Sequence, residues 1–291
     1  MDNRSECKAC QHLEKESNEN CQRPGPDGLP VQCVGPWAED KHHYLRQYLE
    51  ATRAVRKDYL PPNGPGGAAF IDIFAGPGVV RVRDTGDFHD GSPMIAANHE
   101  ASPFTDLVFC DIDPQNASAL RARASQAPGR ATVIEGDSNE VISDVMRHVP
   151  KWGLNIALVD PFALSALKFS TLAQLASVER MDLVIHFPMG DIKRNLWQHE
   201  SSQHNMDEAL GTSRWRSIAK GPGDAARLID VFREQLQTLG YGSKDVRAQP
   251  IKNSSNVVLY YLVYASKHPR GDAIWKSVTK NEPSGQRGFG F

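Results

Sequence analysis

The most constraining feature of the sequence is a ten-residue stretch, 69–78, that reads AFIDIFAGPG. It begins as a short apolar run, which is typical of a strand buried on both faces. It ends in Gly76-Pro77-Gly78, where the chain must turn tightly and the backbone can approach a ligand closely. A strand that leads into a glycine turn at the start of an alternating α/β pattern is where such folds bind nucleotide-like cofactors. We therefore expect an α/β sheet with a ligand site at this turn.

Six further apolar runs complete the set of expected strands. They lie at 106–111, 131–135, 154–159, 182–188, 246–251 and 257–265. Helix-length stretches separate the first four, whereas a short polar link joins the last two, so this pair should be antiparallel. Five strands that alternate with helices and precede an adjacent pair follow the order of the Rossmann-like class I methyltransferase fold. We expect a seven-stranded, mostly parallel sheet with one antiparallel strand and helices on both faces.

Helices are expected before and between these strands. An apolar stripe at three- and four-residue spacing predicts a helix over 40–59. After a polar loop over 81–91, Ser92 is expected as the N-cap of a helix with Pro93 at its first position. Other helices are predicted at 114–126, 170–177, 224–239 and 271–280, and short helices forming a cap at about 190–220.

Length and composition set the domain organisation. The chain has 291 residues, enough for one large α/β domain over 37–291 after an N-terminal segment, 1–36, with little apolar periodicity. A net charge of −2 and a pI near 6.6 argue against non-specific coating of nucleic acid, although a local basic face is not excluded. No apolar run could span a bilayer and the start is not a signal peptide, so we expect a cytoplasmic protein without a membrane partner.

Carboxylates lie at or near the ends of the predicted strands. Ligands of open α/β sheets bind beyond the carboxyl ends of the strands, so these groups should meet at one edge. Two carboxylates, Asp111 and Asp113, are candidates for binding ribose hydroxyls, and we favour Asp111. Asp113 precedes Pro114, so its alternative role is that of a helix N-cap. Asp137 would cap a helix or hydrogen-bond an adenine amino group. The predicted site, for S-adenosylmethionine (SAM), consists of Asp72, Phe74, Ala75, Gly76, Gly78, Asp111, Ile112, Asp137 and Ser138.

The stretch Asp160-Pro161-Phe162 follows the fourth predicted strand of the alternating part. Its carboxylate would accept a hydrogen bond from a substrate amine while the ring stacks on a flat base, and we assign the three residues the catalytic role. The alternative is a strand-end turn with a buried Phe. His186, near the end of the next strand, is a candidate substrate contact or a satisfied core residue.

Basic residues supply further candidates. Lys193 and Arg194 would face the mouth of the sheet and contact substrate. If the substrate is nucleic acid, the phosphate contacts would come from Lys193, Arg194, Arg214, Arg216 and Lys220, and the alternative is solvated charge. Lys41, His42 and His43 open the first helix and are candidates for lining the site, although paired histidines on a helix more often pack or face solvent.

Four of the five cysteines lie in the first 33 residues. Cys7 and Cys10 form a Cys-x2-Cys knuckle, and Cys21 and Cys33 bring the count to the four ligands of a tetrahedral zinc site. A zinc ion would fold a segment that lacks its own core. The spacing of the second pair is irregular, so the alternative is a tail with reduced thiols, whereas a disulfide is disfavoured in a cytoplasmic protein.

The sequence also resembles a known family, the bacterial three-Cys-motif partner proteins. The resemblance runs from about residue 37 to the end and is carried by Lys41-His42 with Leu45 and Tyr48, by 70–78, by Gly91-Ser92-Pro93, by 136–139, by Asp160-Pro161-Phe162 and by 260–275. It implies a methyltransferase-like domain, SAM as cofactor, and a radical-SAM-like partner protein that carries the three cysteines. The N-terminal cysteines lie outside the resemblance.

These observations predict a SAM-dependent methyltransferase-like protein that methylates an amino group of a nucleic acid or of another partner-presented substrate. Asp160-Pro161-Phe162 resembles, with Phe162 in place of a second Pro, the Asp/Asn-Pro-Pro-aromatic motif of amino-methylating nucleic-acid enzymes. The main alternative is a non-catalytic module that acts as a scaffold for a radical-SAM-like protein or nucleic acid. A SAM-dependent lyase or a nuclease on the same fold is a third class.

Overall fold

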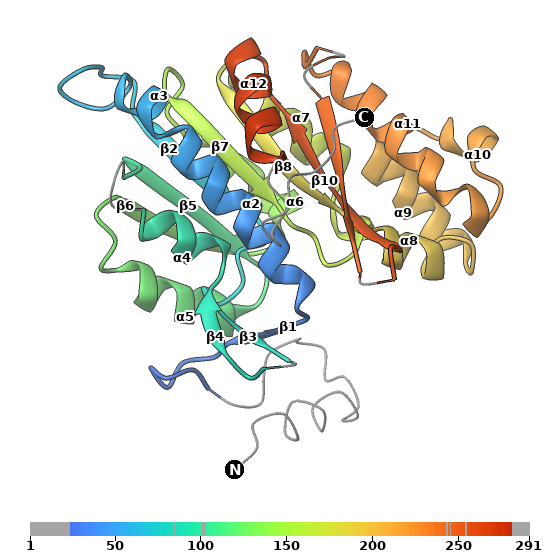
Figure 1. The fold of residues 1–291 in the computed structure, drawn as a ribbon, viewed down its shortest axis with the longest axis horizontal. Helices are drawn as coiled ribbons and strands as arrows, with labels where there is room; N and C mark the ends of the chain where they lie inside the picture. Colours follow the sequence, from blue (N-terminus) through green and yellow to red (C-terminus); the bar gives the residue numbers. More distant parts are fainter. Residues whose placement is uncertain are drawn as a thin grey trace.

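A computed structural model of the chain describes residues 24–83, 85–99, 103–242, 244, 246–253 and 255–280 (Figure 1). Seven strands form the main sheet. They are β2 (Ala68–Asp72), β5 (Asp106–Asp111), β6 (Arg130–Glu135), β7 (Leu154–Val159), β8 (Met181–Phe187), β9 (Val246–Lys252) and β10 (Val258–Ala265). Each lies within two residues of its predicted position.

The strands lie in the order β6-β5-β2-β7-β8-β10-β9. All neighbours pair in parallel except β10, which is antiparallel to both β8 and β9. The predicted Rossmann-like class I methyltransferase fold, with one antiparallel strand, is confirmed. The first strand of this sheet in sequence, β2, lies inside the sheet. The next two strands lie on one side of it and the later ones on the other, so the strand order reverses between β2 and β7. Such a reversal opens a crevice beyond the carboxyl ends of the strands.

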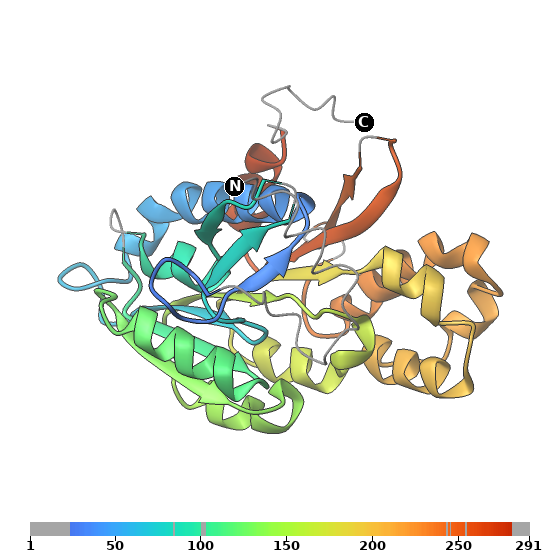
Figure 2. The same ribbon diagram turned by 90° about the horizontal axis from the view of Figure 1, so that it is seen from below.

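A second, three-stranded sheet was not predicted. β1 (Gln32–Val34) pairs in parallel with β3 (Val79–Val82), which pairs antiparallel with β4 (Phe88–Asp90). The prediction of a polar loop over 81–91 is wrong, because β3 and β4 form a hairpin there. The hairpin is looped out between the glycine turn and the next helix, and the Gly91 amide donates to the Gly78 carbonyl over 2.8 Å. This small sheet lies beside the start of α2 (Trp37–Ala51) (Figure 2).

The first predicted helix is interrupted. α2 ends at Ala51 and a short α3 (Arg53–Lys57) follows. Thr52 lies at the break, and its hydroxyl donates to the carbonyls of Tyr48 and Leu49. Back-bonding of this kind competes with the helix ladder and bends helices. The apolar stripe that predicted one helix could not show this local competition.

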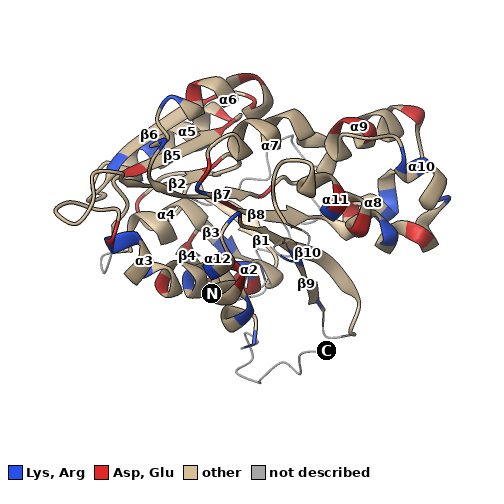
Figure 3. Ribbon diagram, turned by 90° about the horizontal axis from the view of Figure 1, so that it is seen from above, with Lys and Arg blue, Asp and Glu red and all other residues tan. Residues whose placement is uncertain are grey.

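Other helices are α4 (Ser92–Ala97), α5 (Pro114–Ala124), α6 (Ser138–Met146), α7 (Phe169–Ala176), α11 (Leu228–Gln237) and α12 (Pro269–Val278), with 3-10 turns η1 (Leu164–Ala166) and η2 (Pro222–Arg227). Most of these helices lie within two residues of their predicted bounds, but the stretch predicted as one helix over 224–239 divides into a 3-10 turn and α11, and no bounds were predicted for α6. Three short helices, α8 (Met189–Asn195), α9 (Glu200–Leu210) and α10 (Trp215–Ile218), occupy the predicted region of about 190–220. They lie beyond one side of the sheet near α11 and carry charges of both signs (Figures 1 and 3).

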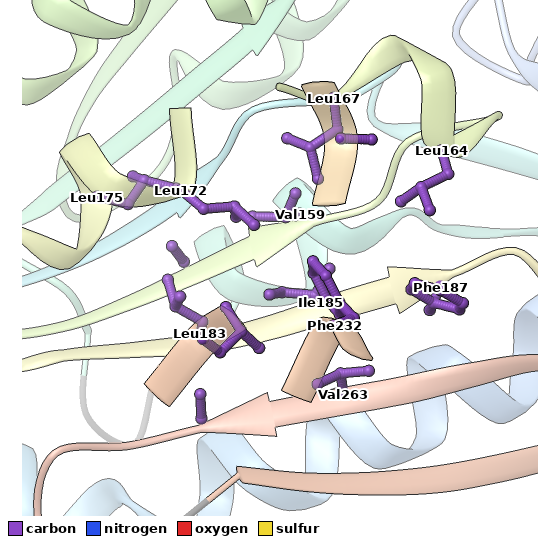
Figure 4. Close-up of a cluster of buried hydrophobic side chains, with 14 of the residues drawn as sticks. Val159, Leu164, Leu167, Leu172, Leu175, Leu183, Ile185, Phe187, Phe232 and Val263 are labelled. Carbon is purple, nitrogen blue, oxygen red and sulfur yellow. The ribbon is translucent and has the colours of Figure 1, made fainter. Parts of the chain in front are cut away.

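The core has two halves, one on each face of the sheet. Alternate residues of β2 divide between them: Ala69 and Ile71 join one buried cluster, and Ala68 and Phe70 join the other. The first cluster includes Val159, Ile185 and Phe187 with the side chains of the helices that cover that face (Figure 4). Leu45 of α2 and Trp275 of α12 belong to the second. Burial on both faces explains why the parallel strands read as continuous apolar runs. No helix among the described residues could cross a membrane.

Candidate functional site

The glycine turn sits directly after β2. Gly76 and Gly78 have φ angles of +62° and +93°, in the left-handed region where side chains are disfavoured. The turn is held from the neighbouring strand, because the Ala75 amide donates to the Cys110 carbonyl over 2.9 Å and the Gly76 amide donates to Asp111 Oδ2 over 2.7 Å. The end of β5 therefore fixes the shape of the turn.

Asp111 is half-buried at the tip of β5. Besides Gly76, it accepts from the Asp113 amide over 2.9 Å and from Asn116 Nδ2 over 3.1 Å, both at Oδ1. Burial raises the pKa of this carboxyl above its ordinary value and outweighs the opposite effect of these donors. A carboxylate can accept about four hydrogen bonds, so three donors leave it capacity for a ligand hydroxyl. The next side chain, Ile112, is 70% exposed.

Asp72 is completely buried. It accepts from Ser92 Oγ over 2.6 Å and from the Phe74 amide over 3.2 Å. Burial raises the pKa of this carboxyl to about 7. The prediction that Ser92 is the N-cap of α4 is wrong: Gly91 takes that position, and the Ser92 hydroxyl bonds to Asp72 instead. Asp72 thus ties α4 to the strand that leads into the turn.

The end of β6 carries polar groups with unused capacity. Asp137 caps α6, since its Oδ1 accepts from the Asn139 amide over 2.8 Å. The Ser138 hydroxyl, Asp113 Oδ2 and Asn116 Oδ1 are buried and have no hydrogen-bond partner within the described part of the chain. Buried polar atoms without partners are rare and call for a ligand or water. They lie near the ends of β5 and β6, so this edge of the sheet could bind a polar ligand.

Asp160 follows β7 on the other side of β2. It forms an ion pair with Lys41 through Oδ2, while His186 Nδ1 lies 3.2 Å from Asp160 Oδ1 and 3.2 Å from the Pro161 carbonyl oxygen. Burial raises the pKa of Asp160, but the charges of Lys41 and His186 lower it by more, and the net pKa lies below its ordinary value. Burial lowers the pKa of His186 and outweighs the influence of Asp160.

Two aromatic residues lie near this carboxylate, Phe162 along the chain and Tyr260 through His186. Phe162 is 67% exposed, so the alternative of a buried Phe at this turn is excluded. The His186 ring packs edge-on against Tyr260 of β10, with 4.5 Å between ring centroids, and the Tyr260 hydroxyl donates to the Trp37 carbonyl over 2.9 Å. Asp160 therefore lies among polar side chains, and the exposed Phe162 follows it two residues later.

Sequence reasoning named Lys41 only as a candidate for lining the site. Its ion pair with Asp160 joins residues 119 positions apart, and no local pattern shows such a contact. A cavity beside Lys41 brings together both sheets and α2. It is lined by Gln32, Val34, Ala38, Lys41, His42, Phe74, Ala75, Pro77, Gly78, Val80, Gly91, Ser92 and Asp160. His42 is buried there, and burial lowers its pKa to about 3, so the ring is neutral.

The predicted basic residues divide into two groups. Lys193 and Arg194 are exposed on α8 and make no ion pair among the described residues. Arg214 is paired with Glu234, and Arg216 with Asp207. The positive charges of Arg214 and Arg216 are already compensated by these carboxylates, so these two arginines would bind phosphate less strongly.

The predicted zinc ligands are not brought together in the described structure. Cys7, Cys10 and Cys21 lie outside the described residues, and Cys33 is a half-buried residue of β1. Within the described part of the chain, no group of three or more His, Cys, Asp or Glu could hold a metal ion. The zinc site stays a prediction.

No protein-family model matches the sequence, and no curated protein matches it. Several solved structures resemble this one in part. A protein from Legionella pneumophila has a TM-score of 0.45 and 9% identity, covering 82% of this chain and 91% of its own. The methyltransferase domain of a bacterial Hen1 has a TM-score of 0.41 and 13% identity, and the match covers 77% of this chain and 99% of that domain. Trm1 from Pyrococcus horikoshii, in complex with S-adenosyl-L-methionine, has a TM-score of 0.43 and 9% identity, and the match covers 90% of this chain and 64% of Trm1.

Proposed function

We propose that the chain is a SAM-dependent methyltransferase that acts on an amino group of a nucleic acid or of another partner-presented substrate. The observation that carries the proposal is the placement of Asp160. It pairs with Lys41 and lies 3.2 Å from His186 Nδ1, it comes two residues before the exposed Phe162, and it lines one cavity with residues of the glycine turn. A site with this geometry holds an acceptor amine close to a ligand bound along the turn.

The cofactor would be held by the chain's own groups. Gly76 and Gly78 let the backbone approach the ligand, and Asp111 and Ile112 would hold the ribose and the adenine. The Ser138 hydroxyl and the Asp113 and Asn116 oxygens, which have no hydrogen-bond partner among the described residues, lie at the same edge. SAM bound there would supply an electrophilic methyl group.

Asp160 would orient the acceptor. With its pKa held below the ordinary value, it is ionised at neutral pH and accepts a hydrogen bond from an amine N–H, which directs the nitrogen lone pair. Phe162 would stack on the flat group that carries the amine. Neutral His186 would take the proton that the nitrogen loses after transfer. Alignment of this kind supplies most of the rate in such a reaction.

The family resemblance extends the proposal. A bacterial, cytoplasmic protein would work beside a radical-SAM-like protein with three cysteines, and Cys7, Cys10, Cys21 and Cys33 would bind zinc. The rival proposal is a SAM-binding scaffold that does not turn over. Both bind the cofactor, but only the first transfers a methyl group.

The test is methyl transfer from tritium-labelled SAM to separated pools of nucleic acid and protein. We expect label in the amino groups of one pool, and Asp160→Asn should lower transfer roughly 100-fold while S-adenosylhomocysteine binding is kept. Asp230→Asn, an exposed carboxylate of α11, is the matched control. Cofactor binding without any labelled product would favour the scaffold, and equal transfer by Asp160→Asn would refute the role of that carboxylate.

A further inference from the structure

The N-terminal segment is docked on the glycine turn by one arginine. Arg123 of α5 donates to both carboxylate oxygens of Asp27, each over 2.8 Å, and to the Pro30 and Pro77 carbonyls over 2.8 and 2.5 Å. Its side chain is only 6% exposed, and its hydrogen bonds to Asp27 hold the pKa of that carboxyl below its ordinary value. Bidentate pairs of this kind are strong and geometrically specific. Arg123 thus fixes the segment that leads into β1 directly against Pro77.

This docking places Gln32 over the turn. A Cβ built on Gly76 would lie 3.1 Å from Gln32 Oε1, so the amide end of Gln32 sits on the face of the turn where a side chain would otherwise project. The Gln32 side chain makes no hydrogen bond with any described residue. A half-buried amide with two N–H donors and a carbonyl acceptor, without a partner among the described residues, is suited to bind a polar ligand.

Two residues of α2 complete a polar wall in the same cavity. Lys41 has three N–H donors, and Asp160 is its one acceptor among the described residues. His42 is 4% exposed, neutral, and without a hydrogen bond to any described residue. The cavity is therefore lined by one ammonium, one amide and one neutral imidazole beside Gly78.

We propose that β1 is part of the ligand site, and that Gln32, with Lys41 and His42, binds the α-amino-acid end of the cofactor. The inference rests on the proposed function. If the nucleoside lies on Asp111 and Ile112 and the acceptor on Asp160, the amino-acid end is left to the third side of the turn, which is this cavity. Its carboxylate matches the Gln32 amide and the Lys41 ammonium. Arg123 acts as a positioning residue, because it holds β1 there without touching the ligand.

A coupling follows from this arrangement. If the ligand is bound in part by β1, it must stabilise the docking of residues 24–34, and loss of docking must weaken binding by the same factor. A ligand that lacks the amino-acid end should show neither effect.

The experiment compares two ligands that share a nucleoside. S-adenosylhomocysteine carries the amino-acid end, and 5′-methylthioadenosine lacks it. Binding is measured by calorimetric titration. We expect Gln32→Ala to lower the affinity for S-adenosylhomocysteine roughly tenfold and Gln32→Glu to lower it further, whereas the affinity for 5′-methylthioadenosine should change less than twofold. Gln47→Ala, an exposed glutamine of α2, is the control and should change neither.

Arg123→Met tests the positioning role. It should lower affinity for S-adenosylhomocysteine selectively and speed amide hydrogen exchange over 24–34, and S-adenosylhomocysteine should slow that exchange in the unmodified chain. If the Gln32 variants lower the affinity for both ligands equally, or do not lower it at all, the inference is overturned while the proposed function stays in place. Failure of the unmodified chain to bind either ligand would refute the proposed function, and the inference with it.

Discussion

Asp111 and Asp160 occupy equivalent positions on either side of β2, and their surroundings differ in kind. Asp111 is satisfied by neutral donors from its own neighbourhood, namely two backbone amides and the side chain of Asn116. Asp160 is satisfied by Lys41 of α2 and His186 of β8. The pKa of Asp111 is raised and that of Asp160 is lowered, although Asp160 is also buried, because only the second carboxylate is paired with a permanent cation, Lys41. In the proposed site, the first carboxylate would accept ligand hydroxyls and the second would keep a permanent negative charge.

The strongest way to break this contrast is to remove the cation. Lys41→Met leaves Asp160 without its ammonium partner, and we expect the free energy of unfolding at pH 7 to fall by roughly 3 kcal/mol, the lower end for a buried pair because both side chains keep some exposure. Urea denaturation would measure the loss.

The same variant has a pH signature. The lowered pKa of Asp160 contributes stability that is present above its unfolded pKa and is lost as pH falls. Without Lys41 that pKa rises, so the deficit of Lys41→Met should shrink towards pH 4. The double variant Lys41→Met, Asp160→Asn should recover part of the deficit. A deficit of equal size at pH 7 and pH 4 would show that the ion pair is not its cause.

Asp72 should show the opposite dependence of stability on pH. Its pKa, raised to about 7, favours the protonated form in the folded chain, so its contribution to stability is present below the unfolded pKa and is lost as pH rises towards 7. Relative to Asp72→Asn, the unmodified chain should lose roughly 2 kcal/mol between pH 5 and pH 6.5. Thermal or urea unfolding at both pH values, with Asp87→Asn on the surface as control, measures the difference. Parallel pH profiles for the two chains would refute the raised pKa.

The smallest effect is expected at the edge of β6. Asp137→Ala removes the N-cap of α6, and the free energy of unfolding should fall by about 1 kcal/mol at any pH above 5. Asp137→Asn keeps the capping oxygen and should lose less. If the two substitutions cost the same, capping is not the role of this side chain in the free protein.

The contrast also explains what sequence reasoning could reach. The main sheet was predictable because strands that are buried on both faces consist of continuous apolar residues. The turn was predictable because its left-handed positions are occupied by Gly76 and Gly78. Asp111 was predictable because its donors are neighbours in sequence or in the adjacent loop. The ion pair of Asp160 was not, because Lys41 lies 119 residues away and only the packing of α2 across the sheet brings it close.

The small sheet was missed for a different reason. Its strands have three or four residues, too short for a clear alternation, and β1 pairs with a strand 48 positions further on, as Gln32 does with Val80. Ser92 matched the pattern of an N-cap, but a buried carboxylate, Asp72, competed for its hydroxyl. Partners chosen by tertiary packing override such local preferences.

The most direct test of the account is calorimetric titration of the purified chain with SAM and S-adenosylhomocysteine, beside Asp111→Ala and Asp160→Asn. The account predicts micromolar binding by the unmodified chain, at least tenfold weaker binding by Asp111→Ala, and nearly unchanged binding by Asp160→Asn. No binding by the unmodified chain at millimolar ligand, or unchanged binding by Asp111→Ala, would contradict the assignment of a cofactor site to the glycine turn and the end of β5.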